Sequence, residues 1–369
     1  MSSYLDLGIP PSSSTVSVKV FDLIPPGDHP KVKVPASFVL DKILPGHEHL
    51  AAPVFAFLVE HASTKARLLF DLGPRKDVEN CAPAVVEMFQ ALFPKTDADI
   101  VDLIEASGIS KNSIQAAIWS HSHVDHSGDM SRFPSSTDLI VSKEMSLETH
   151  KENPASTLLP SDIAGRKIIK IDFETKIGDF KAHDYFGDGS FYLLDVPGHQ
   201  LGHIAGLARV TPTNFVLMGG DSCHHAGVLR PTKLLHSHYP CPGFLLEQSR
   251  KSISVEHFAS NSVTSNHDEF DLAGQTRPLL RIAEGQWNAD HVQAQESADR
   301  LTLFDGNPDV FVVLAHDGSL LPLFARNGTF PVDLSEWKGK GWKQQAVWAF
   351  LDQENPAFRF NSRNSDSEV

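Results

Sequence analysis

The stretch WSHSHVDHSGDM, residues 119–130, contains three histidines and two aspartates directly after an apolar run. A solvated loop has no need for so many imidazole and carboxylate groups, whereas a metal site uses both as ligands. His121 and His123 are two residues apart, so at an extended strand end both side chains point the same way and can face one ion. Asp125 continues this alternation, and His126 begins the next turn. The spacing predicts two neighbouring ligand sets, which could hold two metal ions.

The remaining ligands must come from other parts of the chain. Three polar residues stand beside glycine at the ends of apolar runs: His203 in PGHQLGH, Asp221 in MGGDS and His316 in LAHDG. Glycine lets the backbone turn sharply there and brings the side chain to the rim of a sheet. His199, the first histidine of PGHQLGH, is expected to support the loop rather than bind metal.

The elements around these residues alternate between strand and helix patterns. The segments 53–61 and 66–73 are two apolar runs with a short polar link, which is typical of a hairpin. Helical spacing is found in 79–93, 97–108 and 289–304. Further strands are predicted at 16–23, 113–119, 137–144, 167–172, 190–198, 203–210, 214–222 and 309–318. Two sets of strands, each with helices, predict two sheets packed face to face with helices outside.

The composition is that of an ordinary globular protein, with 369 residues, 41% hydrophobic and 21% charged. A net charge of −14 argues against nucleic acid or an anionic membrane as the main partner. Three cysteines provide no disulfide framework, and neither a signal peptide nor a membrane-spanning run is recognised. We therefore expect a cytoplasmic protein, with its oligomeric state open.

The ordered motifs resemble those of the metallo-β-lactamase-fold hydrolases. HSHVDH matches the HxHxDH signature of that family, and PGHQLGH, GGDS and AHD follow in the family's order. LLFDLG, residues 68–73, resembles the early strand motif whose aspartate supports the ligands, here Asp71. The resemblance covers about residues 53–318, which is most of the chain. It implies an α+β fold, an αββα sandwich of two packed mixed sheets with helices outside.

The resemblance also implies a site for two divalent metal ions, with zinc as the favoured metal. His121, His123 and His203 would hold the first ion, and Asp125, His126 and His316 the second, with Asp221 bridging them. A hydroxide bridging the ions would attack a carbonyl carbon. Asp125 would be the catalytic residue that passes a proton to the leaving group.

Within the family, the chain looks closest to the N-acyl-homoserine-lactonase-like group and to fungal lactone or lactam hydrolases of the benzoxazolinone type. This implies an enzyme whose substrate is a small molecule, a cyclic ester or a cyclic amide, whose ring it opens. A thioesterase of acyl-carrier or coenzyme-linked substrates is the alternative, since it would use the same metal centre. The lactonases place a tyrosine after the bridging aspartate, and no tyrosine directly follows Asp221 here. His224, His225 and Tyr239 are candidates for its role.

We expect three parts along the chain. Residues 1–15 are predicted to be a flexible arm. Residues 16–330 would form the metallo-β-lactamase-fold hydrolase domain, with an insertion at about 223–300. Residues 331–369 would form a C-terminal helical extension and tail.

Overall fold

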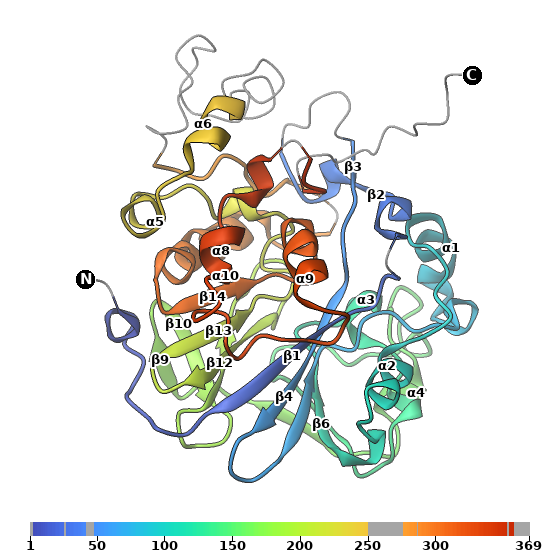
Figure 1. Ribbon diagram of the computed structural model, residues 1–369. Helices are drawn as coiled ribbons and strands as arrows, with labels where there is room; N and C mark the ends of the chain where they lie inside the picture. Colours follow the sequence, from blue (N-terminus) through green and yellow to red (C-terminus); the bar gives the residue numbers. More distant parts are fainter. Residues whose placement is uncertain are drawn as a thin grey trace, which may run out of the picture.

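Two large β-sheets packed face to face form the centre of the molecule (Figure 1). The computed structural model describes residues 3–25, 27–41, 48–249, 276–285, 287–352 and 354–357. Helices cover the outer faces of both sheets, so the architecture is the expected αββα sandwich. Both sheets contain parallel and antiparallel strand pairs.

The first sheet has seven strands, in the order β15-β1-β4-β5-β6-β7-β8. These strands are β15 (Val332–Asp333), β1 (Val16–Asp22), β4 (Phe55–His61), β5 (Arg67–Phe70), β6 (Ile114–Ile118), β7 (Asp138–Ser142) and β8 (Ile168–Ile171). β4 and β5 form the expected antiparallel hairpin, and β5 through β8 run parallel to one another. The carboxyl ends of β5, β6 and β7 therefore meet at one edge of the sheet.

The second sheet has six strands, in the order β14-β13-β12-β11-β10-β9. These strands are β14 (Val310–Val313), β13 (Asn214–Met218), β12 (Ile204–Thr211), β11 (Phe191–Asp195), β10 (Phe180–Asp184) and β9 (Thr175–Ile177). β13 and β14 are parallel, whereas the other neighbours are antiparallel. A separate pair, β2 (Val34–Pro35) and β3 (His49–Leu50), is antiparallel.

Strand alternation explains why the sheets have two apolar faces. In β4, Phe55, Phe57 and Val59 enter the core between the sheets, whereas Ala56 and Leu58 face the helices outside. Successive side chains of a strand point to opposite faces, so a run of apolar residues in β4 serves both layers.

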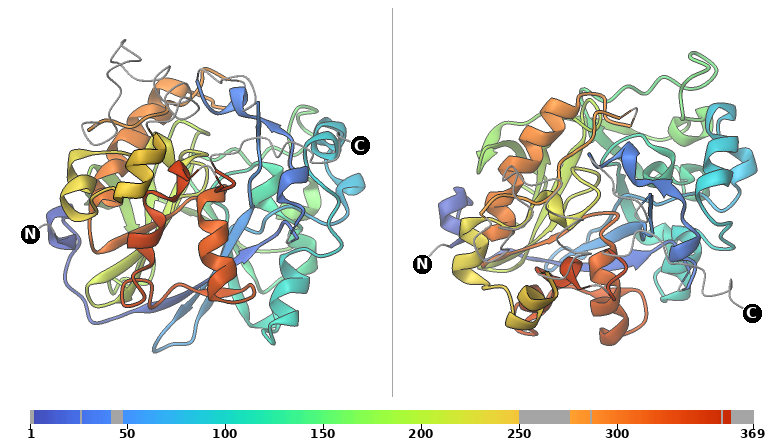
Figure 2. Two further views of the ribbon diagram at one scale, coloured as in Figure 1. Left: turned by 45° about the horizontal axis from the view of Figure 1, so that its top comes forward. Right: turned by 90° about the horizontal axis from the view of Figure 1, so that it is seen from above.

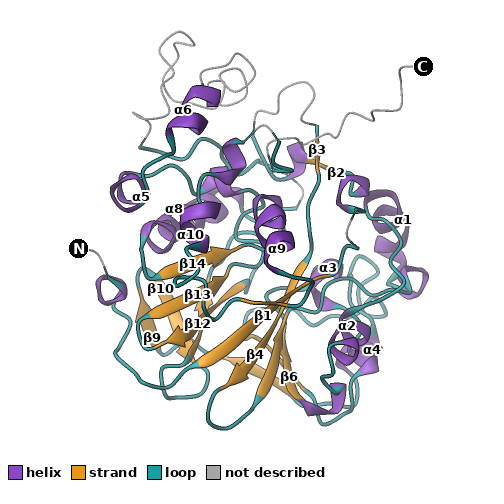
Figure 3. Ribbon diagram, in the orientation of Figure 1, coloured by secondary structure: helices purple, strands orange, loops and turns teal. Residues whose placement is uncertain are grey.

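Helices flank the two sheets on opposite sides in all three views (Figures 1 and 2). The α-helices are α1 (Pro83–Leu92), α2 (Ile100–Ala106), α3 (Val124–Ser127), α4 (Pro160–Ile163), α5 (Lys233–His238), α6 (Gly243–Ser249), α8 (His291–Gly306), α9 (Leu321–Asn327) and α10 (Trp342–Ala346). Helices α1, α2 and α4 lie beside the first sheet, and α5, α8 and α10 beside the second (Figure 3). No helix among the described residues is both long and apolar enough to cross a membrane.

Side-chain hydrogen bonds cap the first turns of α2 and α8. At α2, the Asp99 carboxylate accepts hydrogen bonds from the backbone N–H groups of Val101 and Asp102, and the Asp102 carboxylate accepts one in return. At α8, Asp290 accepts from the Gln293 N–H. Both caps satisfy backbone donors that a helix start leaves free.

Short 3₁₀ turns connect many of these elements. They are η1 (Tyr4–Leu7), η2 (His29–Lys31), η3 (Ala36–Phe38), η4 (Val78–Asn80), η5 (Lys111–Ser113), η6 (Met130–Arg132), η7 (Ala226–Val228), η10 (Gly318–Leu320) and η11 (Ala349–Leu351).

The predicted strands and helices are confirmed. Several shorter elements fall outside the predicted segments: the strands β2, β3, β9, β10 and β15 and the helices α3, α4, α5, α6 and α9. β9 and β10 were missed because their alternating polar residues interrupt any apolar run. Residues 3–15 lie against the second sheet rather than forming a loose arm: Leu7 and Ile9 are buried, and Arg209 donates to the Pro10 carbonyl at 2.5 Å. The predicted insertion is described only in part, since residues 250–275 lie outside the described ranges. The predicted domain boundaries stay a prediction.

Candidate metal centre

The segments that carry the predicted ligands meet at one edge of the sandwich. Asp71 and residues 119–127 follow the parallel strands β5 and β6 of the first sheet. Asp221 and His316 follow the parallel strands β13 and β14 of the second. The Ser120 carbonyl accepts a hydrogen bond at 2.9 Å from the first residue of β12, which ties the two edges together. Residues far apart in sequence thus share one site.

Two glycines make the turns that carry these ligands. Gly220 has φ +52°, and a Cβ there would lie 2.8 Å from His203 Nε2. Gly198 has φ +127°, and a Cβ there would lie 2.1 Å from the backbone nitrogen of Ala294 in α8. Both φ values and both contacts exclude a side chain, so the GGD and PGH turns need glycine at these positions.

A first group of four possible ligands consists of His121, His123, His199 and Asp221, whose ligand atoms all lie within 4.8 Å of one another. His123 Nδ1 is 2.9 Å from His121 Nε2 and 3.0 Å from His199 Nε2. Asp221 Oδ2 is 3.4 Å from His199 Nε2 and 3.8 Å from His121 Nε2. Three imidazole nitrogens and one carboxylate oxygen therefore converge on one region.

A second group lies beside the first and consists of Asp125, His126 and His316. His126 Nε2 is 3.3 Å from His316 Nε2, and Asp125 Oδ2 is 3.6 Å from His316 Nε2 and 3.9 Å from His126 Nε2. Asp221 joins the two groups, because its other oxygen, Oδ1, lies 3.2 Å from both His126 Nε2 and His316 Nε2.

Four histidines of the ligand groups each contact a hydrogen-bond acceptor through Nδ1, the ring nitrogen that points away from the shared centre. Ser120 Oγ donates to Asp71 at 2.9 Å, so it accepts from His121. The four contacts, each made by a Nδ1 atom, are His121 to Ser120 Oγ at 2.9 Å, His126 to Asp71 Oδ2 at 2.9 Å, His199 to Asn288 Oδ1 at 3.0 Å and His316 to the Pro53 carbonyl at 2.9 Å. Each Nδ1 therefore carries a proton, and in the neutral imidazole each Nε2 presents a lone pair to the shared centre.

Asp71 holds this framework in place from an unusual backbone position. Its φ is +59°, a region that residues other than glycine rarely adopt. Its carboxylate accepts from the Ser120 N–H at 2.7 Å as well as from the Ser120 hydroxyl and His126. One buried carboxylate thus orients ligands of both groups, in agreement with its predicted supporting role.

The structure does not bring His203 into either group. Its Nδ1 lies 3.0 Å from the Val196 carbonyl, and its Nε2 accepts a hydrogen bond from the Asp221 backbone N–H at 3.0 Å. The lone pair that would bind metal is therefore already used. His199, which the sequence reasoning set aside, occupies the expected place. Of the two histidines of PGHQLGH, the geometry therefore favours His199 over His203 as a ligand.

Burial and the neighbouring charges shift the pKa values of the two groups in opposite directions. Burial, together with nearby imidazoles, holds the pKa of His121 and His199 well below the usual value, and lowers that of His123 to about 4. Burial also opposes the charge on His126 and His316, but the nearby carboxylates outweigh it and raise both pKa values.

The chemistry of the site fits divalent cations. Asp221 Oδ1 is buried and has no aligned hydrogen-bond partner among the described residues, although two imidazole nitrogens lie 3.2 Å away. Lone pairs of a carboxylate and of imidazoles that face one another repel unless a cation or a proton lies between them. A set of imidazole and carboxylate donors suits Zn²⁺ and related ions.

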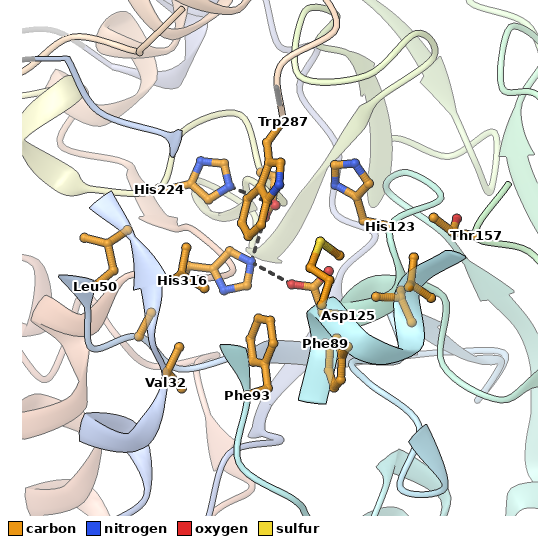
Figure 4. A pocket seen from close by; sticks show the side chains of 16 residues that line it. Val32, Leu50, Phe89, Phe93, His123, Asp125, Thr157, His224, Trp287 and His316 are labelled. Carbon is orange, nitrogen blue, oxygen red and sulfur yellow. Dashed lines mark hydrogen bonds and ion pairs between the residues drawn. The ribbon is translucent and has the colours of Figure 1, made fainter. Parts of the chain in front are cut away.

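An apolar pocket of about 70 Å³ opens onto these groups (Figure 4). His123, Asp125 and His316 form its polar side, and Asp221 and His224 also line it. Its other walls are made of Val32, Val34, Leu50, Ala52, Val85, Met88, Phe89, Phe93, Val124, Thr157 and Trp287. Within this lining, no lysine or arginine is present. A molecule bound here would meet the polar groups on one side and apolar surface on the others.

Of the three candidates for the missing tyrosine's role, only His224 lines the pocket. The Nε2 of His225 donates to the Ala357 carbonyl at 2.9 Å, and the Tyr239 hydroxyl lies 3.5 Å from the Pro308 carbonyl. Trp287 lines the pocket and packs edge-on against Phe38 with ring centroids 5.2 Å apart.

Comparison with known proteins identifies relatives over nearly the whole chain. Residues 50–253 match the family model described as the metallo-beta-lactamase superfamily. The chain is 41% identical to the protein named cytochrome P450 monooxygenase mpaDE' of Penicillium brevicompactum, over 95% of this chain but only 39% of the relative. It therefore spans about two fifths of that relative's length.

A second relative matches along most of its own length. The gamma-lactamase FDB1 of Fusarium pseudograminearum is 35% identical, over 98% of this chain and 88% of the relative. Among solved structures, one described as "Indirect contributions of mutations underlie optimization of new enzyme function" aligns with a TM-score of 0.51 at 19% identity, over 86% of this chain and 98% of that chain. At this identity, the structural match shows the fold alone.

Proposed function

The chain belongs to the metallo-beta-lactamase superfamily, and from this premise we propose that it is a metal-dependent hydrolase that opens an uncharged cyclic ester or cyclic amide carrying an apolar group. The observation that carries the proposal is the convergence of two ligand groups, joined by Asp221, at the mouth of an apolar pocket. The relative named gamma-lactamase, which matches over most of both chains, supports a cyclic amide as one substrate class.

The proposed ligands are those predicted from the sequence, with His199 in place of His203. One ion would be held by His121, His123 and His199 and the other by Asp125, His126 and His316, with Asp221 between them. We propose two divalent ions, with zinc as the metal that this donor set suits best. Bound there, the ions would lower the pKa of a water molecule and polarise the scissile carbonyl.

The protein's own residues have separate tasks in this reaction. Asp125 lies at the pocket wall with its side chain 15% exposed, so its carboxylate can reach the substrate and transfer a proton to the departing oxygen or nitrogen. Asp71, through Ser120 and His126, keeps the ligand imidazoles oriented. The apolar walls exclude water around the reacting group, which strengthens electrostatic interactions inside the pocket.

The walls of the pocket favour a neutral substrate over the alternative, a coenzyme-linked or acyl-carrier thioester. Such thioesters carry phosphate groups, which basic side chains would bind. The lining described above contains no lysine or arginine, whereas Phe89, Phe93 and Trp287 provide aromatic surface. The thioesterase remains the second candidate because the same ligand groups would serve it.

A substrate panel with metal analysis tests the proposal. The purified chain, loaded with Zn²⁺, is assayed against lactones, lactams, thioesters and phosphodiesters with short and long apolar substituents, and its ion content is measured. We expect two ions per chain and ring opening of uncharged lactones or lactams, lost on chelation and restored by Zn²⁺. Preferential turnover of charged thioesters would favour the alternative, and turnover of phosphodiesters alone would overturn both.

A cytoplasmic location and the absence of a nucleic-acid partner stay predictions. All three cysteines, Cys81, Cys223 and Cys241, are free and buried, which is compatible with a reducing compartment.

A further inference from the structure

Among the described residues, the Asp221 carboxylate faces both ligand groups, and few hydrogen bonds fix its orientation. Oδ1 has no aligned hydrogen bond among the described residues, and it faces His126 and His316. Oδ2 accepts one aligned side-chain hydrogen bond, from His224 Nε2 at 3.0 Å. A carboxylate can rotate about its terminal torsion with little cost, because that torsion is broad. Its orientation therefore depends on the contact with His224.

His224 is itself held firmly. Its side chain is 7% exposed, and its ring lies parallel to that of His316, with an interplanar angle of 2° and centroids 5.5 Å apart. On the other side its ring is 5.2 Å from that of His199, at 61°. It thus lies between a residue of the first group and a residue of the second.

The loop around His224 is fixed by its neighbour. The Nε2–H of His225 donates to the Ala357 carbonyl, and its Nδ1 accepts from the Gly227 N–H at 2.9 Å. With both ring nitrogens engaged, His225 anchors the turn between Asp221 and η7. The adjacent His224 is left facing the pocket, where it lies within 4.8 Å of the ligand atoms of Asp221 and His316.

We propose that His224 is a positioning residue that orients the Asp221 carboxylate, so that Oδ2 faces the first ligand group and Oδ1 faces the second. This inference rests on the proposed function, since it assumes that both groups bind an ion. A carboxylate accepts but cannot donate, so the Nε2 of His224 is the donor. Hydrogen bonds to ligating carboxylates pre-orient them, and their loss typically costs about 10–100-fold in metal affinity.

The effect should fall mainly on the second ion to bind. The first group keeps three imidazoles whatever the orientation of Asp221. The second group has two imidazoles and the Asp125 carboxylate, and it gains a fourth ligand only when Asp221 Oδ1 points toward it. Without His224, the carboxylate can turn both oxygens toward the first ion.

Cobalt titration of the metal-free chain tests this inference, with visible absorption and calorimetry reporting each ion as it binds. In the wild type we expect two Co²⁺ ions. In His224→Ala we expect the first ion to bind as in the wild type, the second to bind about 10–100-fold more weakly, and the absorption of the second ion to change. His224→Gln, whose amide can donate to Oδ2, should restore most of the second-site affinity.

His29→Ala is the matched control, because it removes a histidine–carboxylate contact outside the site, between His29 Nε2 and Asp22 Oδ2 at 2.6 Å. Its cobalt titration should equal that of the wild type. If His224→Ala binds both ions with wild-type affinity and absorption, the inference is wrong and the proposed function stands. If the wild type binds fewer than two ions, the two-ion proposal itself fails, and this inference with it.

If His224→Ala does not fold, His224→Gln still tests the inference. A folded glutamine variant that binds the second ion more weakly than the wild type would contradict the proposed role of the hydrogen bond. Wild-type binding of the second ion by His224→Gln would support it.

Discussion

Two hollows in the molecule differ in size and in the state of their polar groups. The pocket at the ligand groups holds about 70 Å³, whereas a cleft between α2 and α9 holds about 970 Å³. In the cleft, the buried Asp22 accepts from the Ile24 N–H at 3.1 Å and contacts His29 at 2.6 Å, so both of its oxygens are engaged. In the pocket, by contrast, Asp221 Oδ1 has no aligned hydrogen-bond partner among the described residues, although it is buried beside the imidazole nitrogens of the ligand groups.

The volume of a hollow therefore does not by itself identify the candidate functional site. Buried polar groups in a protein are normally satisfied, and those that are not point to a missing ion, water or ligand. The larger cleft is bounded mainly by apolar side chains and its buried carboxylate is paired. The smaller pocket contains the groups that a ligand would have to satisfy. Substitutions in the two hollows should therefore have very different effects on turnover.

The largest effect is expected from His121→Ala, which removes a ligand of the first group. We expect turnover to fall by at least about 1,000-fold, because the ions are proposed to supply several kcal/mol of transition-state stabilisation and each tenfold corresponds to about 1.4 kcal/mol. Steady-state kinetics on the best substrate of the panel and metal analysis measure it. If the variant bound fewer ions but kept near-normal turnover, the ligand groups of the small pocket would not be needed for catalysis. The proposed contrast between the small pocket and the larger cleft would then fail.

The next prediction separates His199 from His203. His199→Ala should bind one ion fewer and lose roughly 100-fold in turnover. His203→Ala should keep its ions but leave the buried Asp221 N–H without an acceptor, which lowers the free energy of unfolding by about 1–3 kcal/mol. Ion content and thermal denaturation of both variants are compared. If His203→Ala lost an ion and His199→Ala did not, His203 rather than His199 would be the ligand.

A smaller effect is expected at the apolar wall of the pocket. Trp287→Ala removes aromatic surface, and we expect KM for a substrate with an apolar substituent to rise about tenfold, with kcat little changed, since such a contact contributes about 1.5 kcal/mol. The matched control is Leu103→Ala, which lies in the larger cleft. If both variants raise KM equally, the larger cleft also takes part in binding.

The smallest effect on turnover is expected from His29→Ala in the larger cleft. We expect turnover within about twofold of the wild type, because distant sites act nearly independently. The free energy of unfolding should fall by about 1–3 kcal/mol, since a buried carboxylate loses its partner.

The pH dependence of that stability change sharpens the prediction for His29→Ala. Burial raises the pKa of Asp22, with His29 acting against this rise. A carboxyl group with a raised pKa in the folded state stabilises the fold at low pH, and this contribution is lost as the pH rises. Without His29 the loss should be larger at about pH 7 than at about pH 4. Denaturant unfolding at both pH values measures it, and an equal loss at both would contradict this account.

Much of the fold was predictable because the apolar patterns are strong. The hairpin of β4 and β5, the helices α2 and α8 and the parallel end strand β14 follow from runs of apolar residues and from caps such as Asp99 and Asp290. β9 and β10 were missed because short strands with exposed charged residues carry little periodic signal. The docking of residues 3–15 was missed because it depends on Arg209, almost 200 residues away.

In the candidate site, the sequence was informative where ligands follow strands and less so where they lie on turns. His121 and His123 are two residues apart at the end of β6, and this spacing places both side chains on the same side of the chain. The PGHQLGH turn has no such period, so it could not be predicted which of its two histidines faces the centre. His224 showed no pattern of its own, and only the folded chain, through its contact with Asp221 and its place in the pocket lining, distinguishes it from His225.

The ligand-bearing motifs, the resemblance to the family and the pattern of strands and helices follow from the sequence, because they depend on local spacing and on the alternation of apolar residues. Which histidine of PGHQLGH turns its Nε2 toward the other ligands follows only from the folded chain. The Nε2 of His203 accepts from the Asp221 backbone, whereas Asn288 holds His199 so that its Nε2 faces His123 and Asp221. Such a choice depends on hydrogen-bond partners from distant segments, which meet only when the two sheets pack.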